Sequence, residues 1–349
     1  TQNLELGTRN SELTMLMPDT ISWIIESTIN PIIAPGQLHG DLDVKRAGAA
    51  HVVRVDDAYQ MYYWGTGADD YNRILLATSP VEEPNAWTPQ GVILERQPDA
   101  PYNFQGPSFP HVVRVDEQRW LLYFAGWGQP RPDGKLANTT GVAVSEDGGS
   151  HFSYISDHPV LALDTDYDRE GTGSIYIIRK DGLFRMYYTS IGRYFAKPEN
   201  VETGHGDTIP YIGIGYAESE DGLQWAKPLP HLLIHPRGFV TEPYEYIASN
   251  PCILHDGDLY RMWLNTFGTA YRMRRLISRD GLHWHWQESG IDGEMGVGAA
   301  GCFDDRQRCY VSVVKHGDDY RCWYTGNGFG TTGMGYAVGR RVNSSEPPV

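Results

Sequence analysis

The feature of this chain that most constrains its fold is an aromatic motif that occurs five times. The motifs begin at intervals of 61, 64, 76 and 60 residues. Recurrence at a near-fixed period is the signature of a repeat architecture. The motifs are YYWG at 62–65, YFAG at 123–126, YYTS at 187–190, WLNT at 263–266 and WYTG at 323–326.

Each motif lies within a segment whose pattern predicts antiparallel strands. An apolar run and an Asp- or Gly-containing turn precede it, as in HVVRV at 51–55 followed by Asp56 and Asp57. Two such runs joined by a turn of this kind predict a hairpin. A third apolar run follows every hairpin, and a fourth follows three of them after an Asp-Gly pair. Four antiparallel strands per repeat predict the blade of a β-propeller.

The two ends of the chain are predicted to complete one blade together. The fifth repeat ends at its third strand near Gly339, whereas PDTISW at 18–23 resembles the fourth-strand sequence DGLQW at 221–225. We therefore predict an all-β fold, a single five-bladed propeller whose N-terminal strand closes the last blade. Closure removes exposed sheet edges. The predicted blades span about residues 39–95, 104–163, 168–235, 242–291 and 294–340, the last completed by residues 14–34.

Composition restricts the class of partner. The formal charge of −15 disfavours nucleic acid and anionic membranes as ligands. No apolar stretch approaches the 18 residues of a membrane-spanning helix, and no signal-peptide pattern is present. A cytoplasmic location is the default expectation, and secretion stays open if a leader has been removed.

The chain has 10 Trp and 22 Tyr, most of which we expect in blade packing and the rest in sugar stacking.

The segments just before the first strand of each blade are the candidate site, because they converge on one mouth of the channel. Four of these five segments carry carboxylates. Paired carboxylates across a pocket can cleave a glycosidic bond, one as acid and the other as nucleophile or base. The alternative for any one of them is a solvated salt bridge at a loop bend. His51 and His111 occupy matching positions on two predicted first strands. Each either faces the channel as a site residue or has a structural role.

The chain resembles the five-bladed propeller glycosidases, namely glycoside hydrolase families 43, 32, 68, 117 and 130. The resemblance lies in blade sequences such as LHDGDLYRMW at 254–263 and IGYAESEDGLQW at 214–225. It implies an enzyme that cleaves or transfers a glycosyl unit, with furanosyl units among the candidates. By position, Asp43 or Asp41 resembles the nucleophile or base, Glu170 the acid of the third blade, and Glu245 the competing proton donor.

Two departures from those families keep other functions open. The Asp-Pro that family 43 has before the first strand falls at Ala49 and Ala50, and the Arg-Asp-Pro of the second blade falls near residues 105–107, where no acid is present. A phosphorylase or transferase is therefore an alternative to a hydrolase. A non-catalytic carbohydrate-binding propeller is the alternative from another class. A scaffold for protein partners comes third, because fold alone does not decide function.

The predicted site contains three catalytic carboxylates and a larger set of substrate-binding residues. The catalytic residues are Asp43, Glu170 and Glu245. The substrate-binding residues are His39, Asp41, Arg46, His51, Gln105, His111, Trp127, Asp168, Arg169, Arg193, His205, Asn250, Arg272 and Glu294. The predicted partner is an oligosaccharide or glycoside. No metal site is predicted, since the cysteines lack metal-ligand spacing. No organic cofactor is predicted either.

Overall fold

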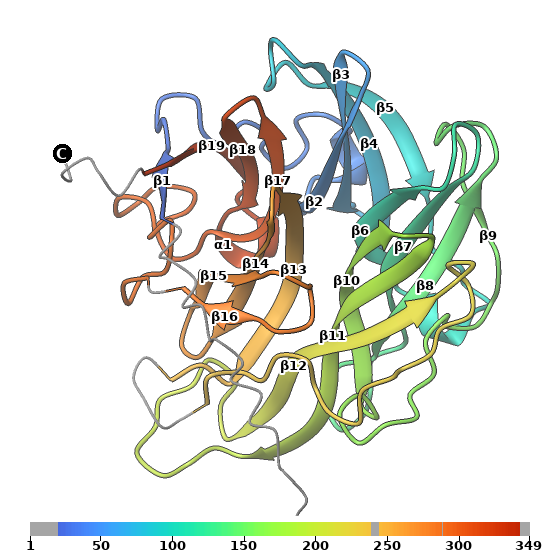
Figure 1. Ribbon diagram of the computed structural model, residues 1–349, viewed down its shortest axis with the longest axis vertical. Coiled ribbons are helices and arrows are strands. Elements are labelled where there is room, and N and C mark those ends of the chain that lie inside the picture. Colours follow the sequence, from blue (N-terminus) through green and yellow to red (C-terminus); the bar gives the residue numbers. More distant parts are fainter. Residues whose placement is uncertain (1–19, 239–243, 288, 343–349) are drawn as a thin grey trace, which may run out of the picture.

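The structure is a computed structural model that describes residues 20–238, 244–287 and 289–342 (Figure 1). Strands make up nearly all of its regular structure. The described helical residues are confined to two short 3-10 helices, Gly40–Leu42 and Pro101–Asn103, and to the four-residue helix α1 (Asn327–Gly330). The predicted all-β class is confirmed. Among the described residues, no helix is long and apolar enough to cross a membrane.

The first two sheets follow the predicted pattern of four antiparallel strands in chain order. One contains β2 (Arg46–Val55), β3 (Ala58–Thr66), β4 (Asn72–Pro80) and β5 (Thr88–Leu94). The other contains β6 (Gly106–Arg114), β7 (Trp120–Trp127), β8 (Asn138–Ser145) and β9 (Ser153–Tyr154).

The third sheet has seven strands because two antiparallel groups are joined along one edge. The first group is β10 (Gly171–Lys180), β11 (Leu183–Ala196) and β12 (Thr208–Ser219). The second is β13 (Ile247–Asp256), β14 (Leu259–Phe267), β15 (Tyr271–Ser278) and β16 (His285–Trp286). A parallel pairing of Ile212 with Ile247 links β12 to β13.

The fourth sheet joins the two ends of the chain, as predicted. Its order is β1 (Ile21–Ile24), β19 (Met334–Arg341), β18 (Asp319–Thr325) and β17 (Cys309–His316). Strand β1 runs antiparallel to β19, with Ile21 opposite Arg341 and Ile24 opposite Val338. Ile21 is buried in the core between this sheet and the preceding strands, whereas Ile24 is 50% exposed. Residues 14–19 of the predicted closing segment lie outside the described part of the chain.

The first strands of the five strand groups surround a common axis. Strand β2 contacts β6, β6 contacts β10, β10 contacts β13, β13 contacts β17, and β17 contacts β2. Figure 1 shows these strands facing the middle of the molecule, with the later strands of each group farther out. Loops that enter and leave the first strands are thereby brought to the ends of this axis.

Every first strand carries a β-bulge at the same point. The register shifts lie between Gly48 and His51 in β2, and at the equivalent positions of β6, β10, β13 and β17. Four of the bulged residues have a positive φ, namely Ala49, Phe109, Asn250 and Tyr310. A bulge interrupts the ladder and turns a side chain away from its regular direction. The repeated bulge therefore directs one residue of each group toward the axis.

The aromatic motifs form the core between neighbouring strand groups, which is the structural role expected for most of them. Tyr62, Tyr123, Tyr187, Trp263 and Trp323 are buried. Trp323 of β18 makes an edge contact with Tyr59 of β3, with ring centroids 5.1 Å apart. The motifs thus pack one group against the next and position the loops at the axis.

Candidate functional site

A pocket of about 410 Å³ lies at the axis and receives residues from all five strand groups. Its aromatic wall consists of Trp64, Phe109, Trp127, Tyr271, Tyr310 and Phe329. Its polar residues include Arg46, Asn138, Ser174, Thr189, His205 and Asn250. Of the predicted site residues, the pocket brings together Arg46, Trp127, His205 and Asn250. Concave sites of this size, largely apolar with a few polar groups, are typical of ligand pockets.

The aromatic wall is a connected set of rings. Trp64 stacks near Trp127 with centroids 6.4 Å apart and contacts Phe109 at 5.3 Å. Phe109 meets Tyr310 edge-on at 4.9 Å, and Tyr310 stacks near Phe329 at 6.0 Å. Such a wall offers ring faces to an apolar ligand surface.

Phe329 is unusual within this wall. It is 38% exposed and has a φ of 60°, a left-handed conformation that is strained for a bulky side chain. Strain of this kind clusters at ligand-binding sites, where the surroundings hold it. Its place in helix α1, directly at the pocket, makes Phe329 the aromatic residue most open to a ligand.

The polar residues supply hydrogen-bonding groups of both kinds. Asn138 donates from Nδ2 to the Thr172 carbonyl at 3.1 Å, and its buried Oδ1 has no partner in the described part of the chain. His205 is exposed, and its Nδ1 lies 2.8 Å from the Tyr246 hydroxyl. Partial burial lowers the pKa of His205, so its imidazole is neutral at pH 7. An unpartnered buried acceptor such as Asn138 Oδ1 suits a ligand hydroxyl.

No Asp or Glu lines this pocket among the residues that the structure describes. The bulged residues that face the axis explain this absence, because they are Ala49, Phe109, Gly173, Asn250 and Tyr310. Ala49 stands where the sequence resemblance would place the Asp of family 43. Asp43, Glu170 and Glu245, which were predicted to converge on this pocket, are therefore not among its described lining residues.

Asp43 instead accepts a hydrogen bond from a tyrosine hydroxyl, in a Tyr–Asp pair that occurs in three of the strand groups. The Tyr63 hydroxyl donates to Asp43 Oδ2 at 2.7 Å, and both side chains are buried. Tyr188 and Asp168 make the same contact at 3.0 Å, and Tyr324 and Asp304 make it at 2.9 Å. The two partners are 20 residues apart each time.

The other two strand groups support this interpretation. Their motifs have Phe124 and Leu264 at the position of the tyrosine, and 20 residues earlier stand Phe104 and Tyr244. An aspartate is therefore present in the three strand groups whose motif has a tyrosine hydroxyl at this position. It is absent from the two groups whose motif has a residue without a hydroxyl there. Burial raises the pKa of Asp43. The contacts of Asp43 and Asp168 favour structural roles over the predicted catalytic and substrate-binding roles.

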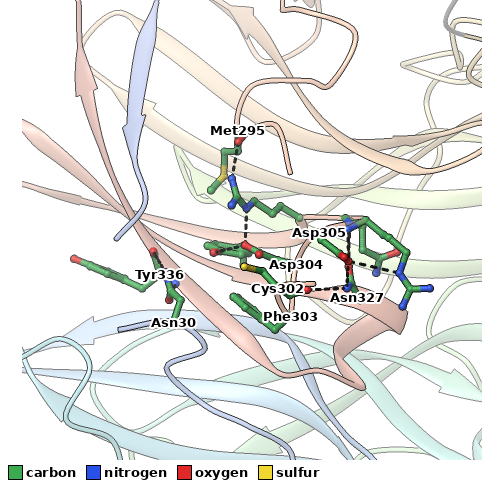
Figure 2. A network of polar contacts seen from close by, with 12 residues as sticks. Asn30, Met295, Cys302, Phe303, Asp304, Asp305, Asn327 and Tyr336 are labelled. Carbon is green, nitrogen blue, oxygen red and sulfur yellow. Dashed lines mark hydrogen bonds and ion pairs between the residues drawn. The ribbon is translucent and has the colours of Figure 1, made fainter. Parts of the chain in front are cut away.

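The Asp304 pair lies in a larger network before β17. Arg308 donates from Nε to Asp304 Oδ2 at 2.6 Å. Figure 2 shows Asp304 close to Phe303 and Cys302, with Asp305 and Asn327 beside it. The Asn327 amide donates to Asp305 Oδ1 at 2.8 Å and so ties helix α1 to the turn that precedes β17. This network holds the segment that carries Phe329.

Glu245 and Glu294 form ion pairs with the buried residues Arg274 and Arg275. Arg274 donates to Glu245 Oε1 from Nη2 at 2.8 Å and from Nε at 3.0 Å, and Thr266 donates to the same oxygen at 2.7 Å. Arg275 donates to Glu294 at 2.9 Å, and Trp23 of β1 donates to Glu294 at 3.3 Å. Neither carboxylate lines the pocket, so these contacts favour structural roles for both.

Glu170 is a predicted catalytic residue whose backbone contacts the pocket wall. Its backbone N–H donates to the carbonyl of Ile191, a pocket-lining residue, at 3.0 Å. Its partly exposed carboxylate lies 3.2 Å from Arg131 and 3.3 Å from Lys135, on the loop that leads into β8. The catalytic roles of Glu170, Asp43 and Glu245 stay predictions.

His51 and His111 lie deeper along the axis, in a narrow cavity of about 20 Å³. This cavity shares Phe109 and Asn250 with the pocket above. The two rings are 4.2 Å apart, and His111 Nε2 accepts a hydrogen bond from the Ile177 N–H at 3.0 Å. Burial lowers the pKa of His51 to about 4, so both rings stay neutral at pH 7. They are core residues of the channel, below the pocket.

The remaining predicted residues lie outside the pocket wall as described. His39 is hydrogen-bonded to Tyr63, and the exposed Arg169 pairs with Asp166. Arg193 lies over the Tyr211 ring, and Arg272 pairs with Asp292. The Asp41 carbonyl accepts a hydrogen bond from the N–H of Ala68, and the backbone of Gln105 bonds to Asn72 of β4 and Trp127 of β7.

Several pocket residues were not among the sequence predictions, namely Trp64, Phe109, Asn138, Tyr310 and Phe329. A usable signal existed for two of them. Phe109 and Tyr310 stand two positions before His111 and Ser312, the same offset that separates Ala49 from His51. Extending the matched histidine positions to all five repeats would have indicated the bulged residues. In the described part of the chain, no cluster of three or more His, Cys, Asp or Glu side chains is placed to hold a metal ion.

Comparison with known proteins identifies relatives of this chain and solved structures of the same fold. No family model matches the chain. The uncharacterized protein MT1551 of Mycobacterium tuberculosis (strain CDC 1551 / Oshkosh) is 32% identical over 315 residues, which are 88% of this chain and 96% of that protein. The uncharacterized protein Rv1502 of Mycobacterium tuberculosis (strain ATCC 25618 / H37Rv) is 31% identical with the same coverage.

Three similar solved structures are glycan-related. A complex of BT0996 and RGII has a TM-score of 0.65 at 18% identity, covering 90% of this protein and 90% of the solved one. A thermostable family-43 glycoside hydrolase has a TM-score of 0.60 at 16% identity, covering 90% of this protein and 94% of its own length. A structure from work on GH130 mannoside phosphorylases and hydrolases has a TM-score of 0.64 at 14% identity. The match covers 96% of this protein and 97% of the solved one.

At these identities the solved structures show a shared fold. The sequence relatives establish the closer kinship. The chain therefore belongs to the same family as the mycobacterial proteins MT1551 and Rv1502.

Proposed function

We propose that this protein is a five-bladed propeller whose axial pocket binds a saccharide. The proposed blades are β2–β5, β6–β9, β10–β12, β13–β16 and β17–β19 with β1. The cycle of contacts among the five first strands supports this division, as does the bulge repeated in each of them. The whole chain then forms one domain, with the boundaries predicted from the repeats.

The observation that carries the proposal is the composition of the pocket wall. Trp127 and Phe329 present aromatic surface, onto which the apolar face of a sugar ring can stack. Asn138, His205 and Asn250 surround it with hydrogen-bonding groups, which sugar hydroxyls require. The pocket volume of about 410 Å³ suits one to a few sugar units.

The same wall argues for binding without carboxylate-driven cleavage. Glycoside hydrolysis by the usual route needs two carboxyl groups on opposite sides of the scissile bond, roughly 5 to 10 Å apart. The described pocket wall offers no carboxylate, and one oxygen of Asp43 and one of Glu245 accept hydrogen bonds from Tyr63 and Arg274. We therefore favour a carbohydrate-binding propeller built on the glycosidase fold.

Glycoside cleavage is the second candidate, and one observation favours it. The backbone N–H of Glu170 donates to the carbonyl of the pocket residue Ile191, and the carboxylate of Glu170 is partly exposed. The similar solved structures include a family-43 glycoside hydrolase. In this alternative Glu170 is the proton donor, and the sequence prediction of Asp43 as nucleophile or base is kept.

The test combines binding and turnover on one panel of ligands. Purified protein is titrated calorimetrically with neutral and acidic oligosaccharides, and each mixture is then assayed for released reducing sugar. The proposal expects saturable binding with no product. If the wild type releases product and Glu170→Gln lowers that rate by roughly 100-fold or more, the loss expected without acid–base catalysis, the second candidate replaces the first. If no saccharide of the panel binds, the proposal is wrong.

A further inference from the structure

Arg46 is the one cationic side chain among the described residues that line the axial pocket. It stands at the start of β2, where the first strand enters the axis. His205, the other titratable base of the wall, is neutral at pH 7 because partial burial lowers its pKa. With no carboxylate in the described wall, the pocket has a local positive charge within a chain of net charge −15.

The guanidinium of the half-buried Arg46 lacks the carboxylate partner that Arg274 and Arg308 have. Arg274 pairs with Glu245 at 2.8 Å, and Arg308 pairs with Asp304 at 2.6 Å. In the described part of the chain no carboxylate pairs with Arg46, and its Nε is buried without a hydrogen-bond partner. A buried charged donor left unpaired is costly, so it indicates a missing partner.

Aromatic rings hold this guanidinium in place. Its central carbon lies 4.2 Å from the centroid of the Trp64 ring and 6.0 Å from that of Phe329. Stacking of this kind uses the flat face of the guanidinium and leaves its N–H edge for a planar acceptor. Arginine so fixed is suited to bidentate recognition of an oxyanion.

We infer that the saccharide bound in this pocket carries a carboxylate, as in a uronic acid unit, and that Arg46 pairs with it. This inference rests on the proposed saccharide binding. A single cation matches the single charge of a carboxylate. A phosphate ester, with a charge of roughly −1.5 to −2, would call for more cationic groups than the described wall has.

The experiment compares matched ligands that differ in this one group. Glucuronate- and galacturonate-containing oligosaccharides are titrated beside their carboxyl-reduced counterparts, with sugar phosphates as a third arm. We expect wild-type protein to bind at least one uronate roughly 10 to 100-fold more tightly than its reduced form, the range of one charged hydrogen-bonded pair. Arg46→Met should abolish that preference, so that the variant binds the uronate and its reduced form alike.

Arg114→Met is the matched control. Arg114 is exposed on β6 and lies over Trp120 at 5.0 Å, so the variant removes the same charge and a similar ring contact away from the pocket. It should keep the uronate preference. Equal binding of uronate and reduced forms by wild type would overturn the inference while leaving saccharide binding intact. Preferential binding of sugar phosphates would also overturn it, and so would a preference that persists in Arg46→Met. Binding of none of the ligands would refute the proposed function itself.

Discussion

The Tyr63 hydroxyl donates a 2.7 Å hydrogen bond to Asp43, a carboxylate that stands 20 residues earlier in the chain. The same relationship joins Tyr188 to Asp168 and Tyr324 to Asp304. In each case the tyrosine belongs to the aromatic motif on a second strand, and the aspartate belongs to the segment before the first strand. The pair therefore fastens the entry loop of a strand group to its own sheet.

We predict that Tyr63→Phe destabilises the protein by about 1 to 3 kcal/mol, the cost of leaving a buried acceptor unsatisfied. Because the pair lies outside the pocket wall, saccharide affinity should change by less than about threefold, a difference of under 1 kcal/mol. Chemical denaturation and calorimetric titration measure the two quantities. Tyr188→Phe and Tyr324→Phe should destabilise the protein less, because Asp168 keeps Lys227 and Asp304 keeps Arg308 as a hydrogen-bond donor. A large loss of affinity in Tyr63→Phe at unchanged stability would restore Asp43 to the binding site.

The closing strand allows a test with two neighbouring isoleucines. Ile21 is 6% exposed and packs in the core, whereas Ile24 on the same strand is 50% exposed. Ile21→Ala should cost about 2 to 5 kcal/mol through lost burial and the cavity left behind. Ile24→Ala, its matched control, should stay within about 0.5 kcal/mol of wild type. Equal effects of the two substitutions in urea denaturation would contradict the pairing of β1 with β19.

The buried histidine His51 predicts a pH dependence of stability. Its folded-state pKa is lowered to about 4 from an ordinary value of 6.5, so the unfolded chain binds more protons between these two values. Stability should therefore be complete above pH 6.5 and fall as the pH decreases from 6.5 toward 4. The loss attributable to His51 is at most about 3 kcal/mol.

His51→Gln, which cannot titrate, isolates this contribution. Unfolding free energies of the variant and the wild type are compared at several values between pH 7 and pH 4.5. The wild type should lose stability more steeply than the variant over this range. Parallel curves would mean that His51 is not held neutral in the folded protein.

Phe329 provides the test of the aromatic wall. Phe329→Ala should weaken saccharide binding by about tenfold, or 1.4 kcal/mol, because it removes the most open ring of the pocket. Ile291 is 68% exposed outside the pocket wall, and Ile291→Ala is the control for loss of an exposed apolar side chain. Phe329→Trp should retain binding. If Phe329→Ala binds like wild type, stacking on this residue plays no part.

The fold was predictable because its signals are local and repeated. Strand runs, Asp-Gly turns and the aromatic motif recur with each strand group, and the sequence of residues 18–23 indicated the pairing of β1 with β19. The position of the pocket was predictable for the same reason, and Arg46, Trp127, His205 and Asn250 do line it.

The roles of the carboxylates were harder to predict, because sequence position does not say which partner a buried acid meets. Asp43, Asp168 and Glu245 belong to segments that lead into first strands, yet their carboxylates accept hydrogen bonds from Tyr63 on β3, from Lys227 and from Arg274 on β15. The pairing of Asp43 with Tyr63 could have been read from its recurrence at one fixed spacing. The partner of Glu245, Arg274, stands on another strand and follows no repeated pattern.

The most direct test of the central claim is a crystal structure of the protein with the oligosaccharide that binds most tightly. The account predicts an intact sugar in the axial pocket, with a ring against Phe329 or Trp127 and hydroxyls within hydrogen-bond distance of Asn138 or His205. A sugar bound elsewhere on the protein would contradict the account. A cleaved product in the pocket, with carboxylates on both sides of the broken bond, would contradict binding without cleavage.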